Sequence, residues 1–514
     1  MRPFDSSQRT IYPVSTVPVL RNFVLLVWLA ALALSFQGCS GGDLGDSCTG
    51  AEDCDSELHC FQGVCTHECE TPFDCGDGYL CTSRGECLTV ESEIGDSCDR
   101  ELACGPGQAC LLDSLDADSD GLIEATCQVE IPGAGTGTPC ETDQECRVGI
   151  CALGRCTQLC LVDTDCPLEL ACVQIPRSLA QGDASYLGCT QGEGVLRMPI
   201  PVDLPFQEVE IPVPSHARSF TLVMQVETGQ HVGMARLTGP DDAVLYATPF
   251  SPQEYLDNPI RYQPGERISA AMIPNSPSVA LGLGIYRAEI GSFLAAGGVG
   301  TAVPRVEVLY KLDDAMNLDL HFYFLNLEDH PCESGLDAEA AMAMPAFQDY
   351  VEQLSSIFAD AGITTGEITY EDILDRPDLD GLATDDADLG SLASLADERP
   401  GLHVFFVRSL DPVGIQALAT GVPGPPLVGN TPASAVAVGV DTLCYRSWSD
   451  LARRSAHAMA QHMGLFDSIA PDGTPDPIPD SGVGGENLMY FSEFGGIELT
   501  EGQASVLAKW AGLR

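Results

Sequence analysis

The sequence predicts a multidomain protein in which small disulfide-rich repeats precede an all-β sandwich and then an α+β domain organised around a sheet. Three observations lead to this order. Twenty of the 23 cysteines fall between Cys48 and Cys189, short alternating apolar runs begin near residue 195, and strand and helix patterns alternate from residue 305 onward. Because a chain of 514 residues is too long for one hydrophobic core, we expect separate domains.

The charge of the chain excludes one class of partner. Its formal net charge is −51, from 75 acidic and 24 basic residues, and Lys311 and Lys509 are its only lysines. Nucleic acids are held mainly by cationic side chains that displace counterions, so we expect no nucleic-acid partner. We expect the acidic residues to form a solvated surface that keeps the chain soluble. The alternative interpretation is that this surface binds basic proteins or cations.

Residues 1–38 have the features of an export signal. Arginines lead into an apolar run, 23–36, that is too short to span a bilayer comfortably. Gly38 and Cys39 then resemble the lipobox of bacterial lipoproteins, whose cysteine is acylated and becomes the first residue of the mature protein. Gln37 and the residue before it depart from that pattern, so cleavage by an ordinary signal peptidase is the alternative.

The lipoprotein resemblance implies a location. Acyl chains on Cys39 would anchor the protein stably in a membrane, with residues 39–47 as a tether. Ser40 after the cysteine implies export to the outer membrane or cell surface of a Gram-negative bacterium. The membrane is therefore an expected partner through this N-terminal lipid.

Residues 48–190 contain five sets of four cysteines. Every set opens with C-x5-C, and an acidic residue precedes the second cysteine in four sets, as at Asp53 and Asp165. Units this small bury too little apolar surface to fold without covalent links, so we expect two disulfides in each module. The CxxC pairs typical of zinc and iron–sulfur sites are absent from the sequence. The spacing is similar to Dickkopf-type and EGF-like repeats, a resemblance that implies no particular partner.

The third module contains an acidic stretch with the order DxDxDGxxE. Its members are Asp116, Asp118, Asp120, Gly121 and Glu124. Oxygen ligands at alternate positions around a glycine turn suit calcium. The twelfth position is Cys127 instead of a bidentate glutamate, so a solvated acidic insert is favoured over a calcium loop.

Residues 195–294 are predicted to form a β-sandwich. Turn residues separate short runs of alternating polarity, which is typical of such folds. The runs are 209–213, 220–226, 232–237, 243–246, 268–273 and 279–290. The domain resembles the jelly-roll-type domains that accompany secreted bacterial peptidases, and a glycine-rich linker, 295–301, follows it.

Residues 305–514 are predicted to form the α+β domain. Buried strands are expected at 318–325, 363–370, 402–407 and 435–440, with an amphipathic helix at 345–361. Cys332 and Cys444 are the two cysteines left over, and we expect them to pair with each other.

The stretch 451–467, LARRSAHAMAQHMGLFD, is the most informative part of this domain. A helix here places His457 and Gln461 one turn apart on one face, and Gly464 allows the chain to turn so that Asp467 returns toward them. Three side chains separated in sequence would thus meet at one point. The two neighbouring arginines, 453–454, are expected to pair with nearby acids.

At these residues the domain resembles the metzincin zinc peptidases, whose pattern is HExxHxxGxxH or HExxHxxGxxD followed by a methionine turn. The resemblance assigns His457, Gln461 and Asp467 to the metal-ligand positions and Met489 to the turn. Ala458 stands where the family has its general-base glutamate, and Gln461 where it has a second histidine. A methyl group takes no proton and a neutral amide is a poor zinc ligand, so no catalytic residue is assigned.

The leading hypothesis is therefore a surface-anchored lipoprotein that presents an inactive metallopeptidase-like domain for binding protein or peptide. Two alternatives belong to other classes: an active zinc endopeptidase with degenerate ligands, and a structural or adhesive envelope protein. No cofactor is expected, and zinc at the remnant site or calcium at the acidic stretch are the alternatives.

Overall fold

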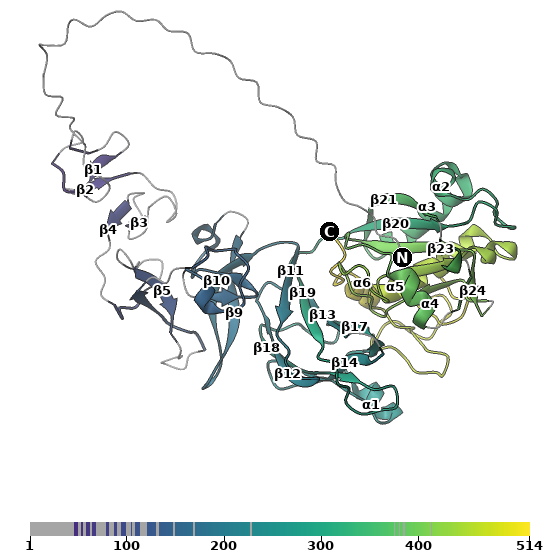
Figure 1. Ribbon diagram of the computed structural model, residues 1–514, viewed down its shortest axis with the longest axis horizontal. Coiled ribbons are helices and arrows are strands. Elements are labelled where there is room, and N and C mark those ends of the chain that lie inside the picture. Colours follow the sequence, from purple (N-terminus) through teal and green to yellow (C-terminus); the bar gives the residue numbers. More distant parts are fainter. Residues whose placement is uncertain are drawn as a thin grey trace, which may run out of the picture. The chain divides into compact units, whose positions relative to one another are not determined.

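The computed structural model describes residues 46–514 apart from internal stretches, most of them between residues 50 and 169 and the others at 227–228, 375, 380, 384–385 and 413 (Figure 1). The predicted export signal and Cys39 lie outside the described residues, and so do Asp116, Asp118 and Asp120. The chain divides after Cys65 into two units, and each is considered by itself.

Each cysteine-rich module contains a two-stranded sheet that carries its third and fourth cysteines, one on each strand (Figure 1). The pairs are β1 (His59–Phe61) with β2 (Val64–Thr66), β3 (Tyr79–Cys81) with β4 (Cys87–Thr89), β5 (Gln108–Leu112) with β6 (Ala125–Val129), β7 (Cys151–Ala152) with β8 (Arg155–Cys156), and β9 (Leu170–Leu179) with β10 (Gly182–Gln191). Short 3-10 helices precede the second cysteine in the last two modules, η3 (Asp143–Glu145) and η4 (Asp163–Asp165).

The disulfide pattern is the same in the four modules whose bonds are described. The first cysteine pairs with the third and the second with the fourth. The bonds are Cys48–Cys60, Cys54–Cys65, Cys98–Cys110, Cys104–Cys127, Cys140–Cys151, Cys146–Cys156, Cys160–Cys172 and Cys166–Cys189. This confirms the prediction of disulfide-bonded repeats and gives the connectivity that the spacing left open.

The repeated acidic residue before the second cysteine has a structural task. Asp53 Oδ2 accepts a hydrogen bond from the Thr49 backbone N–H at 2.8 Å, and Asp165 Oδ2 accepts one from Leu161 at 2.8 Å. Glu145 accepts from the backbone of its own module in the same way. The acid therefore satisfies backbone donors in the turn after the first cysteine, and this structural role explains why an acidic residue recurs at that position.

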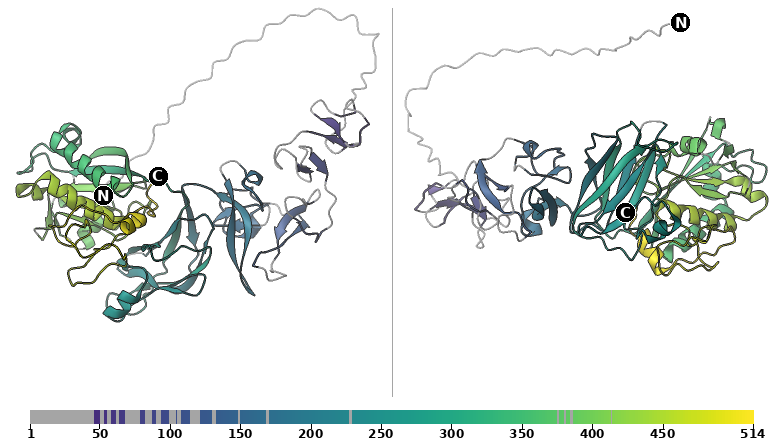
Figure 2. Two further views of the ribbon diagram at one scale, coloured as in Figure 1. Left: turned by 180° about the vertical axis from the view of Figure 1, so that it is seen from behind. Right: turned by 90° about the horizontal axis from the view of Figure 1, so that it is seen from below.

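Two antiparallel sheets follow the modules (Figures 1 and 2). The first has the order β11 (Val195–Ile200), β19 (Arg305–Lys311), β13 (Ser219–Gln225) and β17 (Ile268–Ile273). The second has the order β12 (Phe206–Val213), β18 (Gly284–Phe293), β14 (His231–Thr238) and β15 (Val244–Ala247), with β16 (Gly265–Glu266) also pairing with β14. A short helix, α1 (Pro252–Asp257), follows β15 in the chain.

One hydrophobic cluster contains side chains from both sheets. Leu222 and Val308 of the first sheet belong to it together with Ile211 and Ile290 of the second, and all four are fully buried. The strand β19 pairs with β11 on one side and β13 on the other. Residues 305–311 therefore complete this sheet, whereas the predicted domain boundary assigned them to the following domain. Local sequence shows that a segment can form a strand, but it does not show which sheet the strand joins.

The C-terminal region is built on a five-stranded sheet with the order β21 (Thr364–Ile373), β20 (Asn317–Leu325), β23 (Leu402–Val407), β26 (Val436–Gly439) and β25 (Ala417–Ala419). All neighbouring pairs are parallel except β25 with β26. Its further elements are α2 (Ala338–Ala343), α3 (Pro345–Ala359), η5 (Pro377–Leu379), β22 (Gly381–Ala383), α4 (Asp386–Ala393), β24 (Ser409–Asp411), η6 (Val440–Cys444), α5 (Trp448–His462) and α6 (Glu501–Leu507).

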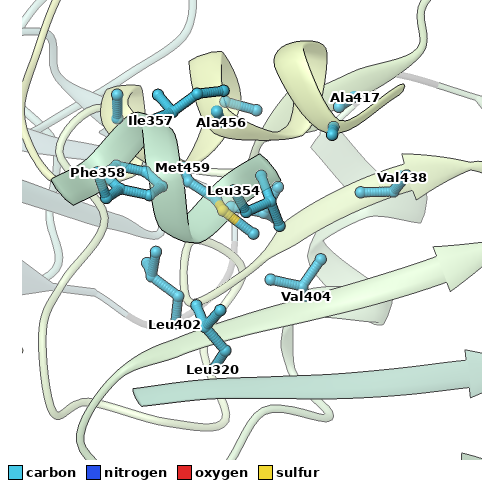
Figure 3. Close-up of a cluster of buried hydrophobic side chains, with 14 of the residues drawn as sticks. Leu320, Leu354, Ile357, Phe358, Leu402, Val404, Ala417, Val438, Ala456 and Met459 are labelled. Carbon is cyan, nitrogen blue, oxygen red and sulfur yellow. The ribbon is translucent and has the colours of Figure 1, made fainter. Parts of the chain in front are cut away.

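Both faces of this sheet are covered, so its central strands β20 and β23 are almost entirely buried and are rich in apolar residues. On one face, Leu320 and Val404 pack against α3 and α5, where Leu354 and Met459 contribute to a single core (Figure 3). On the other face, alternate residues such as Phe405 join a second cluster with α4. The long helix α5 is thereby held against the sheet beside the edge strand β25.

The first antiparallel sheet and the C-terminal region share buried contacts. Met272 of β17 belongs to the core that contains α3 and α5, and Ser219 Oγ bonds to the Lys509 carbonyl. Within the C-terminal region itself, the backbones of Asn317 and Arg514 exchange two hydrogen bonds of 2.9 Å. These contacts join residues that lie far apart in the sequence.

Candidate functional site

The helix α5 begins and ends at residues suited to those positions. Ser447 Oγ accepts from the Asp450 N–H at 3.1 Å while Asp450 Oδ2 accepts from the Ser447 N–H at 3.1 Å, which is a capping box. The helix ends at His462, and Gly464 follows with a φ of +107°. A Cβ at Gly464 would also lie 2.5 Å from the Met272 methyl, so only glycine fits this turn.

The turn brings together the three side chains that the sequence placed at metal-ligand positions. His457 Nε2 lies 3.2 Å from Asp467 Oδ1, and the Gln461 amide N–H donates to the same oxygen at 2.9 Å. His457 is 5% exposed, and its Nδ1 lies 2.8 Å from the Leu488 carbonyl oxygen. Because a carbonyl only accepts, Nδ1 carries a hydrogen and the lone pair or N–H of Nε2 faces the carboxylate.

The donor set at this point does not fit a zinc site with three protein ligands. Catalytic zinc sites use three imidazole, carboxylate or thiolate ligands. Here His457 and Asp467 supply two, while the Gln461 amide uses its N–H to bond Asp467 instead of presenting an oxygen. Among the described residues, groups of three or more His, Cys, Asp or Glu that could share a metal are all cysteines, and those cysteines are bonded in disulfides.

Ala458 follows His457, at the position where the metzincin resemblance led us to look for a general base. Its methyl group is fully buried and belongs to the apolar core between α5 and the sheet. No proton can be held there, so the residue offers packing and no acid–base chemistry. His462 gives no replacement: its ring packs against Gly424 and edge-to-face on Trp510, with ring centroids 6.0 Å apart.

The loop after the predicted methionine turn forms one wall around this cluster. Met489 is fully buried in the same core, and its N–H bonds to Asn487 Oδ1 at 2.7 Å. Asn487 Nδ2 bonds in turn to Gln503 of α6 at 2.9 Å. A fixed backbone therefore places the Leu488 carbonyl where it can orient His457.

Arg453 holds this loop, and the expectation that it pairs with an acid was wrong. Its guanidinium donates to the backbone carbonyls of Gly496, Glu493 and Ser492 at 3.0, 2.9 and 3.1 Å. Burial, and then the neighbouring Arg454, lowers the pKa of Arg453 to about 10. A guanidinium carries five donors in a rigid fork, so one side chain can satisfy several carbonyls of an irregular loop; helix periodicity gives no sign of such partners.

Glu493 connects the loop to the edge of the sheet. Its Oε2 accepts from Gln416, which precedes β25, at 3.2 Å and from Arg446 at 3.1 Å. Arg446 also lies over the Phe494 ring, 5.2 Å from its centroid. Phe494 is 72% exposed, so the rim of the cluster carries an accessible aromatic side chain that the sequence did not single out.

In the described part of the chain, the edge strand β25 pairs with a strand on one side alone. Thr420 N–H bonds to Ala435 and the Gln416 carbonyl accepts from Gly439, so residues 416 and 420 face β26. Alternation along an antiparallel strand then directs the N–H and C=O of Ala417 and Ala419 to the opposite side. In the described part of the chain no hydrogen bond satisfies these groups, and β25 ends the sheet there.

The remaining predicted site residues lie elsewhere. Cys332 and Cys444 form a disulfide. Glu124 is described, but the three aspartates of the acidic stretch are not, so a calcium loop stays a prediction. Cys39 likewise lies outside the described residues.

Comparisons with known proteins assign no family. No family model matches the chain, and no curated protein matches it. A solved structure titled "Structure of a chaperone-substrate complex" is similar at 10% identity with a TM-score of 0.22, over 42% of this chain and 36% of that one. The chain thus spans about a third of that structure's chain, and the likeness assigns no fold.

Two further properties bear on where the protein works. In the described part of the chain every helix is too short or too polar to cross a bilayer. The disulfides of the repeats form and persist in oxidising surroundings, which suits an extracellular or surface protein.

Proposed function

We propose that this protein is a surface-anchored lipoprotein whose C-terminal domain is an inactive relative of the metzincin peptidases and binds protein or peptide segments in an extended conformation. The observation that carries the proposal is the state of the former catalytic centre. A buried methyl group stands at the general-base position Ala458, and the Gln461 amide bonds Asp467 where a second imidazole would bind zinc.

The arrangement around that centre supports a retained architecture. The turn at Gly464, the return of Asp467 to His457, and the buried Met489 are the features that the metzincin resemblance implies. Such an arrangement gives a shaped, buried cluster without a nucleophile activator. Selection for peptide hydrolysis would have kept the carboxylate, because removing the base removes proton transfer from the attacking water.

The edge strand β25 supports a role in peptide binding. A peptide lying alongside it could pair with the unsatisfied N–H and C=O groups of Ala417 and Ala419 and so extend the sheet. Main-chain pairing of this kind gives affinity with little dependence on sequence. The exposed Phe494 and the carboxylate of Glu493 near the same strand would then select among side chains.

Zinc content and cleavage test the loss of catalysis. The purified protein is expected to retain far less than one zinc per chain after dialysis and to cleave neither casein nor a peptide library. An active peptidase with degenerate ligands would instead hold stoichiometric zinc and show cleavage that a chelator abolishes. That result would overturn the proposal.

A selection of phage-displayed peptides tests the binding role. Ala419→Pro removes an outward N–H from β25 and leaves the bonds to β26 in place, so it should weaken a selected peptide at least about tenfold. Glu501→Gln, an exposed change at the start of α6, is the control and should leave affinity unchanged. An unaltered affinity in Ala419→Pro would refute pairing along this strand, and a selection that returns no peptide would favour the structural or adhesive alternative.

Lipid anchoring has its own test. Expressed in a Gram-negative host with a labelled fatty acid, the protein should carry the label and sediment with the outer membrane, whereas Cys39→Ser should do neither. Secretion of unlabelled native protein would indicate cleavage by an ordinary signal peptidase.

A further inference from the structure

A cavity lies away from the His457 cluster, between the loop that follows α1 and the loop that leads from Asp467 toward the predicted methionine turn. Its volume is about 620 Å³, within the range of roughly 300–1,000 Å³ typical of small-molecule sites. Ser276, in the loop after β17, donates through Oγ to the Pro477 carbonyl at 3.0 Å and so bonds a third loop to the one that leads from Asp467.

Three buried polar side chains line the cavity, and each has an atom that lacks a partner among the described residues. They are Arg261, Ser468 and Asp476, which are 3%, 1% and 9% exposed. The unpartnered atoms are Arg261 Nε, Ser468 Oγ and Asp476 Oδ2. Buried polar groups are almost always hydrogen-bonded to protein, water or ligand, so three such atoms around one cavity are available to bond a molecule that enters it.

Each charged side chain is fixed on one side and free on the other. Arg261 Nη1 donates to the carbonyls of Tyr255 and Asn258 at 3.0 and 2.7 Å, and its guanidinium lies 4.6 Å from the Tyr255 ring centroid. Asp476 Oδ1 accepts from the Ile478 N–H at 3.0 Å and the Ser481 hydroxyl at 2.6 Å. Groups held in this way need little reordering when a ligand arrives.

The two charges have opposite sign and no direct ion pair joins them. Each nevertheless influences the other electrostatically: Asp476 is among the groups that act on Arg261, and Arg261 among those that act on Asp476. A ligand with one charge would leave the other buried and unpaired, which is costly. A ligand with adjacent opposite charges would satisfy both at once.

Much of the remaining wall is apolar and rigid. Four prolines, at 259, 475, 477 and 479, line it together with Leu256, Ile478 and Val483, while Asp257, Asn258 and Ser278 add polar groups; none of the described aromatic side chains lines it. The cavity therefore offers no aromatic ring on which a sugar or base could stack. An aliphatic side chain could bury its surface against the proline rings. The nearby Arg261 also disfavours a bare metal cation.

We propose that this cavity binds a free α-amino acid with an aliphatic side chain. Its carboxylate accepts from Arg261 Nε, its ammonium donates to Asp476 Oδ2 and Ser468 Oγ, and its side chain lies against the prolines. The proposal is independent of the proposed function, because it uses none of the residues of the His457 cluster.

Calorimetry on the full chain tests the proposal with L-leucine as the probe. A Kd of about 1 mM or tighter is expected for a ligand of this size. Two matched analogues, 4-methylpentanoate and 3-methylbutylamine, each lack one charge and should bind at least about tenfold more weakly. Glycine, which lacks the side chain, should also bind more weakly.

Variants assign the contacts. Asp476→Asn keeps an oxygen for Ile478 and Ser481 but removes the charge, and Arg261→Met removes the cation; each should weaken leucine at least about tenfold. Asp472→Asn, an exposed change in the same loop outside the cavity wall, is the matched control and should leave binding unchanged. The proposal is overturned if leucine shows no saturable binding at about 20 mM, if both analogues match leucine, or if a crystal soaked with leucine holds water alone in the cavity.

Discussion

Burial of the Asp476 carboxyl predicts how the free energy of unfolding depends on pH, and the structure gives the size of the effect. Burial raises the pKa of this carboxyl from 3.8 to about 6, against smaller lowering effects of its hydrogen bonds with Ser481 and Ile478. The folded protein thus binds the proton more tightly than the unfolded chain does. Between pH of about 4 and 6 the folded state holds more protons, so the free energy of unfolding falls as pH rises through this window.

Above about pH 6 the carboxylate destabilises the fold by about 3 kcal/mol, from 1.36 kcal/mol for each pH unit that separates the two pKa values. Asp476→Asn removes this cost and keeps an oxygen for the two donors, although its amide N–H₂ remains without a partner at about 1 kcal/mol. We therefore expect the variant to be more stable than the native protein by about 2 kcal/mol at pH 7.5, and no more stable at pH 4.

Urea unfolding of both proteins at pH 4 and pH 7.5, with the disulfides intact and far-UV circular dichroism as the readout, measures the difference. Carboxyl groups common to both proteins cancel in this comparison. Asp472→Asn is the control, because hydrogen bonds with Thr474 lower the pKa of Asp472 and its loss should give no gain at pH 7.5. An equal effect of Asp476→Asn at both pH values, or destabilisation at pH 7.5, would refute the reasoning.

Three further predictions concern the C-terminal domain. Arg453→Met should lower the free energy of unfolding, measured by heat or urea, by about 3 kcal/mol, because several loop carbonyls lose their hydrogen-bond donor. Arg454→Met loses one hydrogen bond of 3.3 Å and should lower it by about 1 kcal/mol; equal losses would contradict this assignment. Gln461→His supplies a second imidazole and should tighten zinc at least about tenfold in a competition titration, and an unchanged affinity would show that the cluster cannot close on a metal. Replacing both Cys332 and Cys444 with serine opens a link across 112 residues and should lower stability by about 4 kcal/mol, which a native-like unfolding midpoint would disprove.

Much of the fold was predictable because its signals are local. The repeated cysteine spacing indicated disulfide modules, since short units depend on covalent links, and the bonds are present in the described modules. The apolar runs 318–325 and 402–407 indicated buried strands, and they form β20 and β23 in the centre of a sheet. Helix periodicity likewise indicated α3, and the stretch 451–467 was predicted to be helical where α5 lies.

Part of the candidate site was predictable for the same reason. The helical spacing of His457 and Gln461, with a glycine before Asp467, predicted that the three side chains meet, and their atoms lie about 3 Å apart. Spacing within one helix and one turn is set by local geometry. The chemistry that these residues perform stays a prediction.

Tertiary packing decided what no local pattern encodes. The predicted boundary at residue 305 assigned 305–311 to the last domain, yet β19 completes a sheet with β11 and β13, because strand pairing is decided by tertiary packing. The sequence by itself determined the cysteine modules, the strand and helix segments, and the local geometry around His457. Only the folded chain brought Arg453 to five backbone carbonyls and placed Arg261 and Asp476 around one cavity, since these partners lie tens to hundreds of residues apart and meet through packing alone.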